Sequence, residues 1–162
     1  MERRTFLRNG ATSSLVAAVV PAVAGSSAGP AETASRTKMD AVFTERAPKP
    51  AGPYSQAIRA NGFIFAAGQT ARDPQTQQIV EGDITVQTER VLENLKLVLN
   101  AAGSSLERTV KTTVFLTSMD DFAAMNKVYS RYFPSHPPAR STVEVSRLNG
   151  GSHIEIELIA LS

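Results

Sequence analysis

The chain has 162 residues, no cysteine, two histidines and a formal net charge of +2. The lack of cysteine excludes a thiol nucleophile, a cysteine-ligated zinc site and an iron–sulfur cluster. His136 and His153 each lack a second ligand at metal-binding spacing, so we expect no metal site.

The first 24 residues have the pattern of an export signal. Arg3-Arg4 precedes Phe6-Leu7 and a short apolar stretch that ends in Ala-Val-Ala at residue 24. The stretch is shorter than the ~20 residues that span a membrane. We predict a twin-arginine-type signal peptide over 1–24, a flexible linker over 25–38, one domain over 39–162, and a periplasmic or secreted location. A disordered tail is the alternative for the first segment.

The excess of positive charge lies in this N-terminal segment. Residues 1–24 hold three arginines and one glutamate, so the basic residues fall from 17 to 14 and the acidic residues from 15 to 14 without them. The rest of the chain therefore has no net charge. This balance argues against nucleic acid as a partner, because nucleic-acid binding needs a basic surface.

Residues 55–68 are predicted to form a β-hairpin. Asn61-Gly62 is a preferred pair for a tight two-residue turn, and the returning strand over 63–67 is apolar. Residues 83–102 follow with apolar side chains at helical spacing. Asp83 is the expected N-cap, and Gly103 is the expected residue just after the helix.

The second half of the chain predicts a strand, a helix and two more strands. These lie over 110–116, 118–133, 139–145 and 154–161. The order ββαβαββ indicates an α+β fold, with two helices packed on one face of a mixed sheet. The last strand carries apolar residues on both of its faces, which predicts association between subunits.

Arg140 opens one of these strands with no acidic residue beside it in sequence. A guanidinium on a partly apolar strand needs a partner, and its planar fork suits a carboxylate held by two hydrogen bonds. A small-molecule carboxylate is one candidate. An ion pair within the protein, with Glu144, Glu155 or Glu157, is the other.

Seven short motifs, in this order, resemble the RidA (YjgF/YER057c/UK114) family of reactive imine and enamine deaminases. The resemblance covers about residues 41–161. The motifs are Gly52-Pro53-Tyr54-Ser55-Gln56, Ala67-Gly68-Gln69, the helix with Asn94-Leu95 and Ala101-Ala102-Gly103, Lys111-Thr112-Thr113-Val114-Phe115, Asn126, Pro138-Ala139-Arg140-Ser141 and Ile154-Glu155-Ile156-Glu157.

The resemblance implies a chorismate-mutase-like fold and a homotrimer with clefts between subunits. It also implies hydrolysis of 2-aminoacrylate, 2-iminopropanoate or 2-iminobutanoate to 2-oxo acids and ammonia, without a cofactor. Arg140 would hold the substrate carboxylate, Glu155 the attacking water, and Tyr54 would close the pocket. Four further positions are implied to bind substrate: Ala67, Gly68, Asn126 and Thr142.

Two departures from the family pattern are visible. Well-known deaminases of the family carry a serine at the position of Ala67 and a cysteine at the position of Thr142. A non-catalytic module that binds small carboxylates through Arg140 is therefore an alternative, and a ribonuclease or stress-chaperone role is another. A hairpin around Asn149-Gly150 is expected to bring Glu155 near residues 142–144, and its register decides whether Glu155 and Arg140 share a face.

Overall fold

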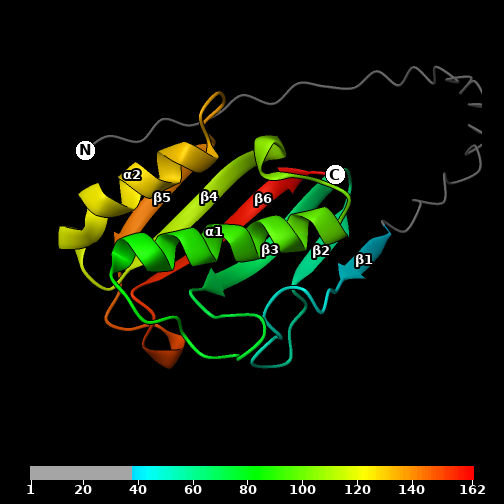
Figure 1. Cartoon of the computed structure of the whole chain (residues 1–162). Helices are drawn as coiled ribbons and strands as arrows, with labels where there is room; N and C mark the ends of the chain where they lie inside the picture. Colours follow the sequence, from blue (N-terminus) through cyan, green and yellow to red (C-terminus); the bar gives the residue numbers. More distant parts are fainter. Residues whose placement is uncertain (1–37) are drawn as a thin grey trace, which may run out of the picture. The chain divides into compact units, whose positions relative to one another are not determined.

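The computed structural model describes residues 38–162, so the predicted signal segment and nearly all of the predicted linker lie outside the described residues. Six strands and two helices form one α+β unit (Figure 1). Their bounds are β1 Met39–Val42, β2 Ala57–Ala60, β3 Phe63–Thr70, α1 Ile84–Ala101, β4 Thr109–Leu116, α2 Phe122–Tyr132, β5 Ala139–Glu144 and β6 Ile154–Leu161. Within this part of the chain, no helix has the length and apolar character needed to cross a membrane.

The predicted hairpin is present as β2 and β3. Ala60 pairs with Phe63 across the turn, and Asn61 and Gly62 both have positive φ, at 50° and 79°. Two consecutive residues with positive φ make the tight turn whose twist matches that of paired strands. β3 continues to Thr70, beyond the predicted end, through an irregularity between Ala66 and Gln69.

Helix α1 has the predicted signals at both ends. The Asp83 side chain accepts hydrogen bonds from the N–H groups of Thr85 and Val86 at 2.9 and 3.1 Å. These bonds satisfy two donors that a helix N-terminus otherwise leaves free. Gly103 follows the helix with a φ of +78°, the left-handed conformation that glycine adopts without strain.

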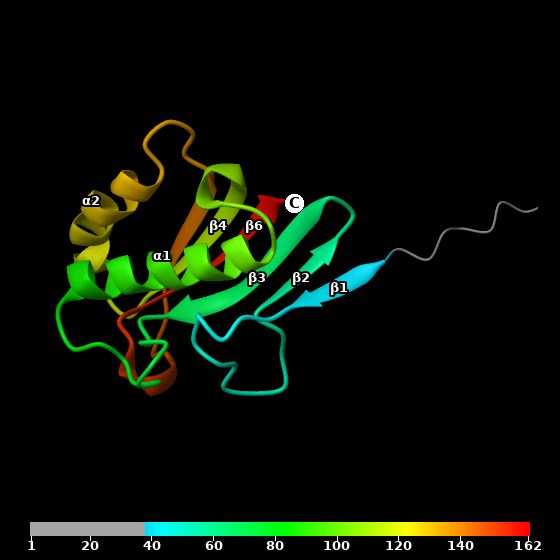
Figure 2. The same ribbon diagram turned by 45° about the vertical axis from the view of Figure 1, so that its right-hand side comes forward.

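The sheet has the order β1-β2-β3-β6-β4-β5, and only β4 and β5 run parallel (Figures 1 and 2). The mixed sheet with two helices on one face is confirmed. The hairpin expected between the last two strands is wrong, because β4 lies between β5 and β6. Helix α2 connects β4 to β5, as a parallel pair requires. The first strand, β1, was not predicted.

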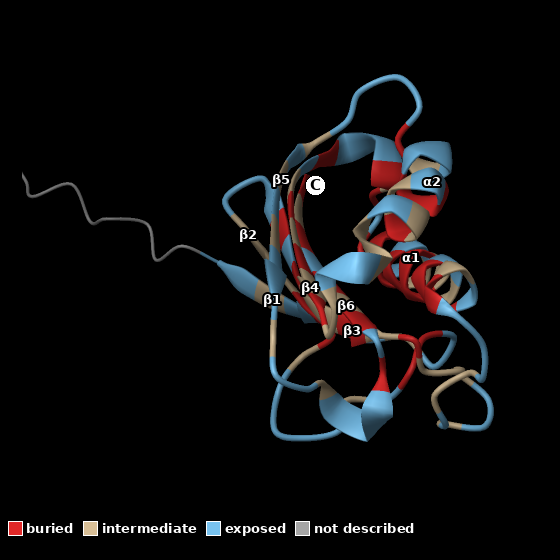
Figure 3. Ribbon diagram, turned by 90° about the vertical axis from the view of Figure 1, so that its left-hand side faces the viewer, coloured by how far each residue is buried: buried red, intermediate tan, exposed pale blue. Residues whose placement is uncertain are grey.

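The two helices cover one face of the sheet and leave the other open (Figure 3). Alternate residues of β6 are buried under the helices: Ile154, Ile156, Leu158 and Ala160. On the open face Phe63, Phe65 and Leu161 keep 39%, 46% and 40% of their surface exposed. The apolar character of both faces of β6 is therefore present, but in one chain only the helix-covered face is fully buried.

Candidate functional site

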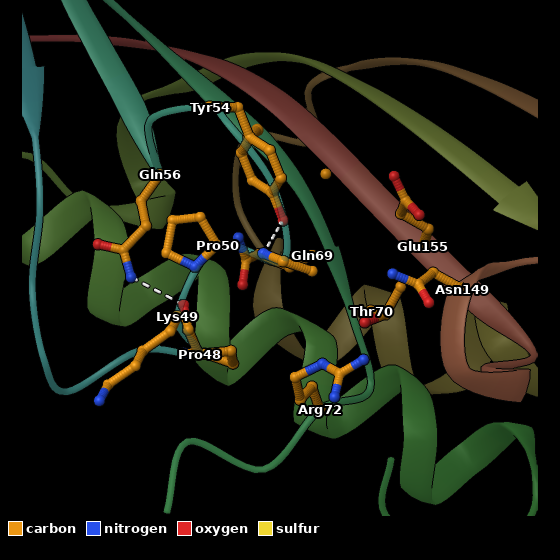
Figure 4. Close-up of a pocket in the computed structure, with 13 residues that line it drawn as sticks. Pro48, Lys49, Pro50, Tyr54, Gln56, Gln69, Thr70, Arg72, Asn149 and Glu155 are labelled. Atoms are coloured by element: carbon orange, nitrogen blue, oxygen red, sulfur yellow. Dashed lines mark hydrogen bonds between the residues drawn. The ribbon is translucent and has the colours of Figure 1, made fainter. Parts of the chain in front are cut away.

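A cavity of about 310 Å³ lies where β3 and β6 meet the loops before β2 and after β5 (Figure 4). Of the predicted site residues, Tyr54, Ala67, Gly68 and Glu155 line it. Its other lining residues are Pro48, Lys49, Pro50, Ala51, Gln56, Gln69, Thr70, Arg72 and Asn149. Most of these others were not predicted, since they come from loops without a periodic pattern.

Glu155 is the carboxyl group of this cavity. It lies on β6 beside Thr70 of β3, and burial raises the pKa of its carboxyl above the ordinary value, with a further rise from the charge of Glu157. Gly68 makes room for it, because a Cβ added there would lie 2.8 Å from the Glu155 carboxyl carbon. The cavity thus holds a half-buried carboxyl whose raised pKa favours the acceptance and return of a proton.

Tyr54 stands at the mouth of the cavity, and 49% of the residue's surface is exposed. Its hydroxyl oxygen accepts a hydrogen bond from the Ala51 N–H at 3.0 Å, which leaves the hydroxyl proton free to be donated elsewhere. The buried Gln56 side chain fixes the neighbouring loop by donating to the carbonyl oxygens of Thr44 and Pro48 at 3.1 and 2.8 Å. This wall is therefore held by hydrogen bonds as well as by packing.

Two buried polar residues of α1, seven positions apart and so on one helix face, hold the far side of the cavity. The Asn94 amide donates to the carbonyl oxygens of Thr70 and Arg72 at 3.2 and 2.7 Å. The Gln87 side chain accepts a 2.7 Å hydrogen bond from the N–H of His153, just before β6. The helix thereby fixes two segments beside the cavity, the end of β3 with the residues after it and the start of β6.

Arg140 lies elsewhere, in a hollow between β5 and α2 that Asn126 also lines. Its guanidinium carbon is 4.6 Å from the ring centre of Tyr129 and 5.6 Å from that of Phe122. Aromatic faces attract a cation at such distances. They support the guanidinium without using its hydrogen-bond donors, which stay available for a ligand.

Tyr129 is itself fixed in place. Its hydroxyl shares a 2.7 Å hydrogen bond with the Thr112 hydroxyl on the neighbouring strand, and the residue is buried. Burial raises the pKa of the Tyr129 hydroxyl, although the bond to Thr112 and the positive charge of Arg140 act in the opposite direction. The ring beneath Arg140 is therefore a rigid, neutral platform.

Arg140 and Glu155 lie on opposite faces of the sheet. Arg140 pairs with Thr112, whose other neighbour is the buried Leu158 on the helix-covered face. Glu155 pairs with Phe115 and, in the alternation of β6, faces the open side. The register that the sequence left undecided thus separates the two groups.

The ion pairs expected as the alternative for Arg140 are absent from the part of the chain that the structure describes. There, no carboxylate oxygen lies within 4.0 Å of the guanidinium, and Glu144 instead accepts a 2.8 Å hydrogen bond from the Met119 N–H. Thr142 lies on the face of Arg140 but lines neither hollow, and its buried hydroxyl has no hydrogen-bond partner among these residues.

Across residues 38–162, no three of the His, Asp and Glu side chains gather into a group that could hold a metal ion. The two hollows together supply an arginine without an ion-pair partner among the described residues, a carboxyl of raised pKa and a hydroxyl donor. These groups suit the addition of water to a substrate that carries a carboxylate.

Comparison with known proteins identifies relatives over the whole of this unit. The family model described as endoribonuclease L-PSP matches residues 44–162. A RutC family protein of Pyrococcus abyssi is 57% identical, over 75% of this chain and 95% of its own length. The mouse 2-iminobutanoate/2-iminopropanoate deaminase is 41% identical, over 74% of this chain and 89% of its own.

A solved structure shares the fold. The crystal structure of E. coli TdcF with bound serine has a TM-score of 0.72 and 40% identity, and the match covers 76% of this chain and 98% of that chain. Both the sequence and the fold of the present chain therefore point to the same group of proteins. The chain therefore belongs to the endoribonuclease L-PSP family, the RidA and RutC family that its motifs resemble.

Proposed function

We propose that the protein hydrolyses reactive 2-imino acids of the 2-aminoacrylate, 2-iminopropanoate and 2-iminobutanoate type to 2-oxo acids and ammonia. We further propose a homotrimer in which each site combines the Glu155 cavity of one copy with Arg140 of a neighbouring copy. The separation of these two groups on opposite sheet faces carries the proposal. One chain holds them on opposite faces, so a second copy would be needed to bring both groups to one substrate.

The open face of the sheet supports the association. Its exposed aromatic and aliphatic side chains, Phe63, Phe65 and Leu161, belong to adjacent strands β3 and β6. A contiguous apolar surface of this kind is the usual sign of a protein interface. Closed rotational symmetry would cover the same face in every copy.

Arg140 performs the binding step in this proposal. Its guanidinium would hold the substrate carboxylate by two hydrogen bonds, while the rings of Tyr129 and Phe122 pack against the guanidinium and keep it in place. Fixing the carboxylate places the imine carbon at a set distance from the groups of the cavity. The contribution is one of position and orientation.

Glu155 performs the proton transfers. As a carboxylate it takes a proton from water, whose oxygen bonds to the carbon of the protonated imine to give a carbinolamine. It then returns that proton to the nitrogen and, as the carbon–nitrogen bond breaks, takes the hydroxyl proton, which it passes to the departing ammonia. The products are the 2-oxo acid and ammonium, and Glu155 is again a carboxylate. A carboxyl with a raised pKa suits both halves of this cycle. The Tyr54 hydroxyl is placed to donate a hydrogen bond at the same cavity.

The named activity of the mouse relative supports the reaction, and the retention of Arg140 and Glu155 in this chain agrees with it. A second candidate is a non-catalytic module that binds small carboxylates. The serine bound to E. coli TdcF favours it, as does Ala67, which brings no hydroxyl to the cavity.

Ammonia release separates the two candidates. The purified protein is supplied with freshly generated 2-iminopropanoate and 2-iminobutanoate, and ammonia is followed against the spontaneous rate. A deaminase accelerates release of ammonia from both. If the folded protein binds pyruvate but leaves the spontaneous rate unchanged, the binding module is correct and the deaminase is not.

We also propose export, on the strength of Arg3-Arg4 and the apolar stretch that follows. We expect residues 1–38, fused to a reporter that is active only outside the cytoplasm, to export the reporter from the cytoplasm. Replacement of both arginines by lysine would abolish this, because the twin-arginine pathway requires the pair. An unchanged reporter signal in the lysine variant would contradict that route.

A further inference from the structure

The cavity of Glu155 has a polar end that the proposed reaction does not use. Thr70, Arg72 and Asn149 form this end, and Lys49 lies on the loop beside it. Figure 4 shows Arg72 at the end away from Tyr54, with Thr70 and Asn149 between Arg72 and Glu155. We call these four residues the polar end of the cavity.

Arg72 is fixed in place at this end. Its carbonyl oxygen accepts the 2.7 Å hydrogen bond from the Asn94 amide, and its guanidinium donates to the carbonyl oxygen of Gln77. The guanidinium also lies close to the chain at Gly150, where an added Cβ would come within 3.1 Å of Nη2. One of its five donors is thus used, and the side chain has little freedom to move away.

The positive charge of Arg72 has no ion-pair partner among residues 38–162. The ion pairs within residues 38–162 join Lys38 to Asp40, Lys96 to Glu93 and Arg131 to Glu89. Neither Arg72 nor Lys49 takes part in one, and no hydrogen bond found among these residues uses the side chains of Thr70 or Asn149. The polar end therefore offers two unpaired cations and uncommitted hydrogen-bond donors.

We propose that the polar end binds a second carboxylate on the substrate, so that the preferred substrates are dicarboxylic 2-imino acids. This rests on the proposed deaminase function. The substrate's 2-carboxylate would bind Arg140 of the neighbouring copy, and its side-chain carboxylate would bind Arg72. A guanidinium fork recognises a carboxylate by two parallel hydrogen bonds. Thr70 and Asn149 can add neutral donors, and Lys49 adds positive potential from the neighbouring loop.

A purely structural role for Arg72 makes a different prediction. Through the Gln77 carbonyl, Arg72 also holds the turn at residues 73–78. If that were its whole purpose, its loss would slow every imino acid to the same extent. A subsite for a second carboxylate instead changes the ratio between substrates. The ratio of kcat/KM values is therefore the quantity to measure.

The experiment compares four imines generated in place from their amino acids. Two have neutral side chains, 2-iminopropanoate and 2-iminobutanoate, and two are dicarboxylic, 2-iminosuccinate and 2-iminoglutarate. Full-length wild type, Arg72→Met, Arg72→Lys and the control Arg46→Met are assayed, and thermal unfolding checks each fold. Arg46 is exposed and does not line this cavity.

We expect wild type to favour at least one dicarboxylic imine. Arg72→Met should lower the dicarboxylic-to-neutral ratio of kcat/KM by about ten- to a hundredfold, because a charged hydrogen-bonding pair is lost. Arg72→Lys should restore part of the ratio, and Arg46→Met should leave it unchanged. Pyruvate and oxaloacetate, tested as competing ligands, should show the same change of preference.

Three results would overturn the inference. Equal kcat/KM values of wild type for neutral and dicarboxylic imines would exclude the subsite, while the proposed deaminase function would still hold. A uniform loss across all four imines in Arg72→Met would assign the residue to the turn alone. No acceleration of any imine by folded wild type would instead reject the proposed deaminase, and this inference with it.

Discussion

The two hollows of this molecule differ in what they contain and in how they are built. The hollow around Glu155 is a cavity enclosed by loops and fixed by buried amides of α1, and it holds a carboxyl whose pKa burial has raised. The hollow around Arg140 lies at the sheet edge over two aromatic rings. One hollow holds a carboxyl of raised pKa, and the other holds an arginine that no carboxylate of the described residues pairs with. The difference supports the proposal that each chain contributes two half-sites to different active sites.

Glu155→Gln should have the largest effect, because it removes the proton-transfer group and keeps the size of the side chain. We expect ammonia release to fall by about 10²- to 10⁴-fold. Binding of pyruvate, followed by calorimetry, should persist. The control is Glu81→Gln in the exposed loop before α1. Full activity of Glu155→Gln would remove the chemical role from this hollow.

Arg140→Ala should come next, with a loss that appears in carboxylate binding as well as in rate. We expect kcat/KM for 2-iminopropanoate to fall by about 10²-fold, because the substrate loses its charged anchor and its orientation. Arg131→Ala on α2 is the matched control, since that guanidinium lies 3.8 Å from Glu89 and outside the hollow. Equal KM values for wild type and Arg140→Ala would contradict the binding role.

How much of this was visible in the sequence depends on whether a feature is local. The Asn61-Gly62 turn and the Asp83 cap follow from neighbouring residues, and the structure has both. The place of β4 between β5 and β6 does not follow from neighbouring residues, because a strand pattern shows where a strand lies in the sequence and not which strand it pairs with. Strand β1, with only Met39–Val42, was too short for a pattern to show.

The same distinction between local and long-range features applies to the two proposed half-sites. Arg140 and Glu155 were predicted by residue type and by resemblance, but their opposite faces depend on the register of β4 with both neighbouring strands. Arg72 and Asn149 enter the cavity only because α1 holds one loop and a turn holds the other. Long-range placement of this kind leaves no signal within any short window of sequence.

Tyr129→Leu sharpens the comparison at the Arg140 side. It removes the ring beneath the guanidinium, and a cation–aromatic contact of this kind contributes about 0.5–2 kcal/mol. We expect KM to rise by about three- to tenfold with a smaller change in kcat. Tyr129→Phe keeps the ring and should restore most of the KM. Tyr132→Leu, whose hydroxyl instead donates to Glu93, is the control. Equal effects at both tyrosines would indicate general loosening of α2.

The smallest effect concerns stability against pH on the Glu155 side. The native pKa of Glu155 lies above the ordinary value of 4.5, so the native state holds this proton more tightly than the unfolded chain does. Its contribution to the free energy of unfolding is full below 4.5 and is lost as pH rises through the raised pKa. Denaturant unfolding of Glu155→Gln should show less of this loss, and Glu81→Gln should match wild type.

The most direct test asks whether two inactive chains restore a site between them. Arg140→Ala and Glu155→Gln chains are co-expressed in equal amounts, and ammonia release from 2-iminopropanoate is measured on the mixed assembly. If each site takes Glu155 from one copy and Arg140 from the next, about a quarter of the sites in a random cyclic assembly are intact, so about a quarter of wild-type activity returns. Activity no higher than that of the two separate variants, in assemblies shown to be mixed, would contradict the shared site.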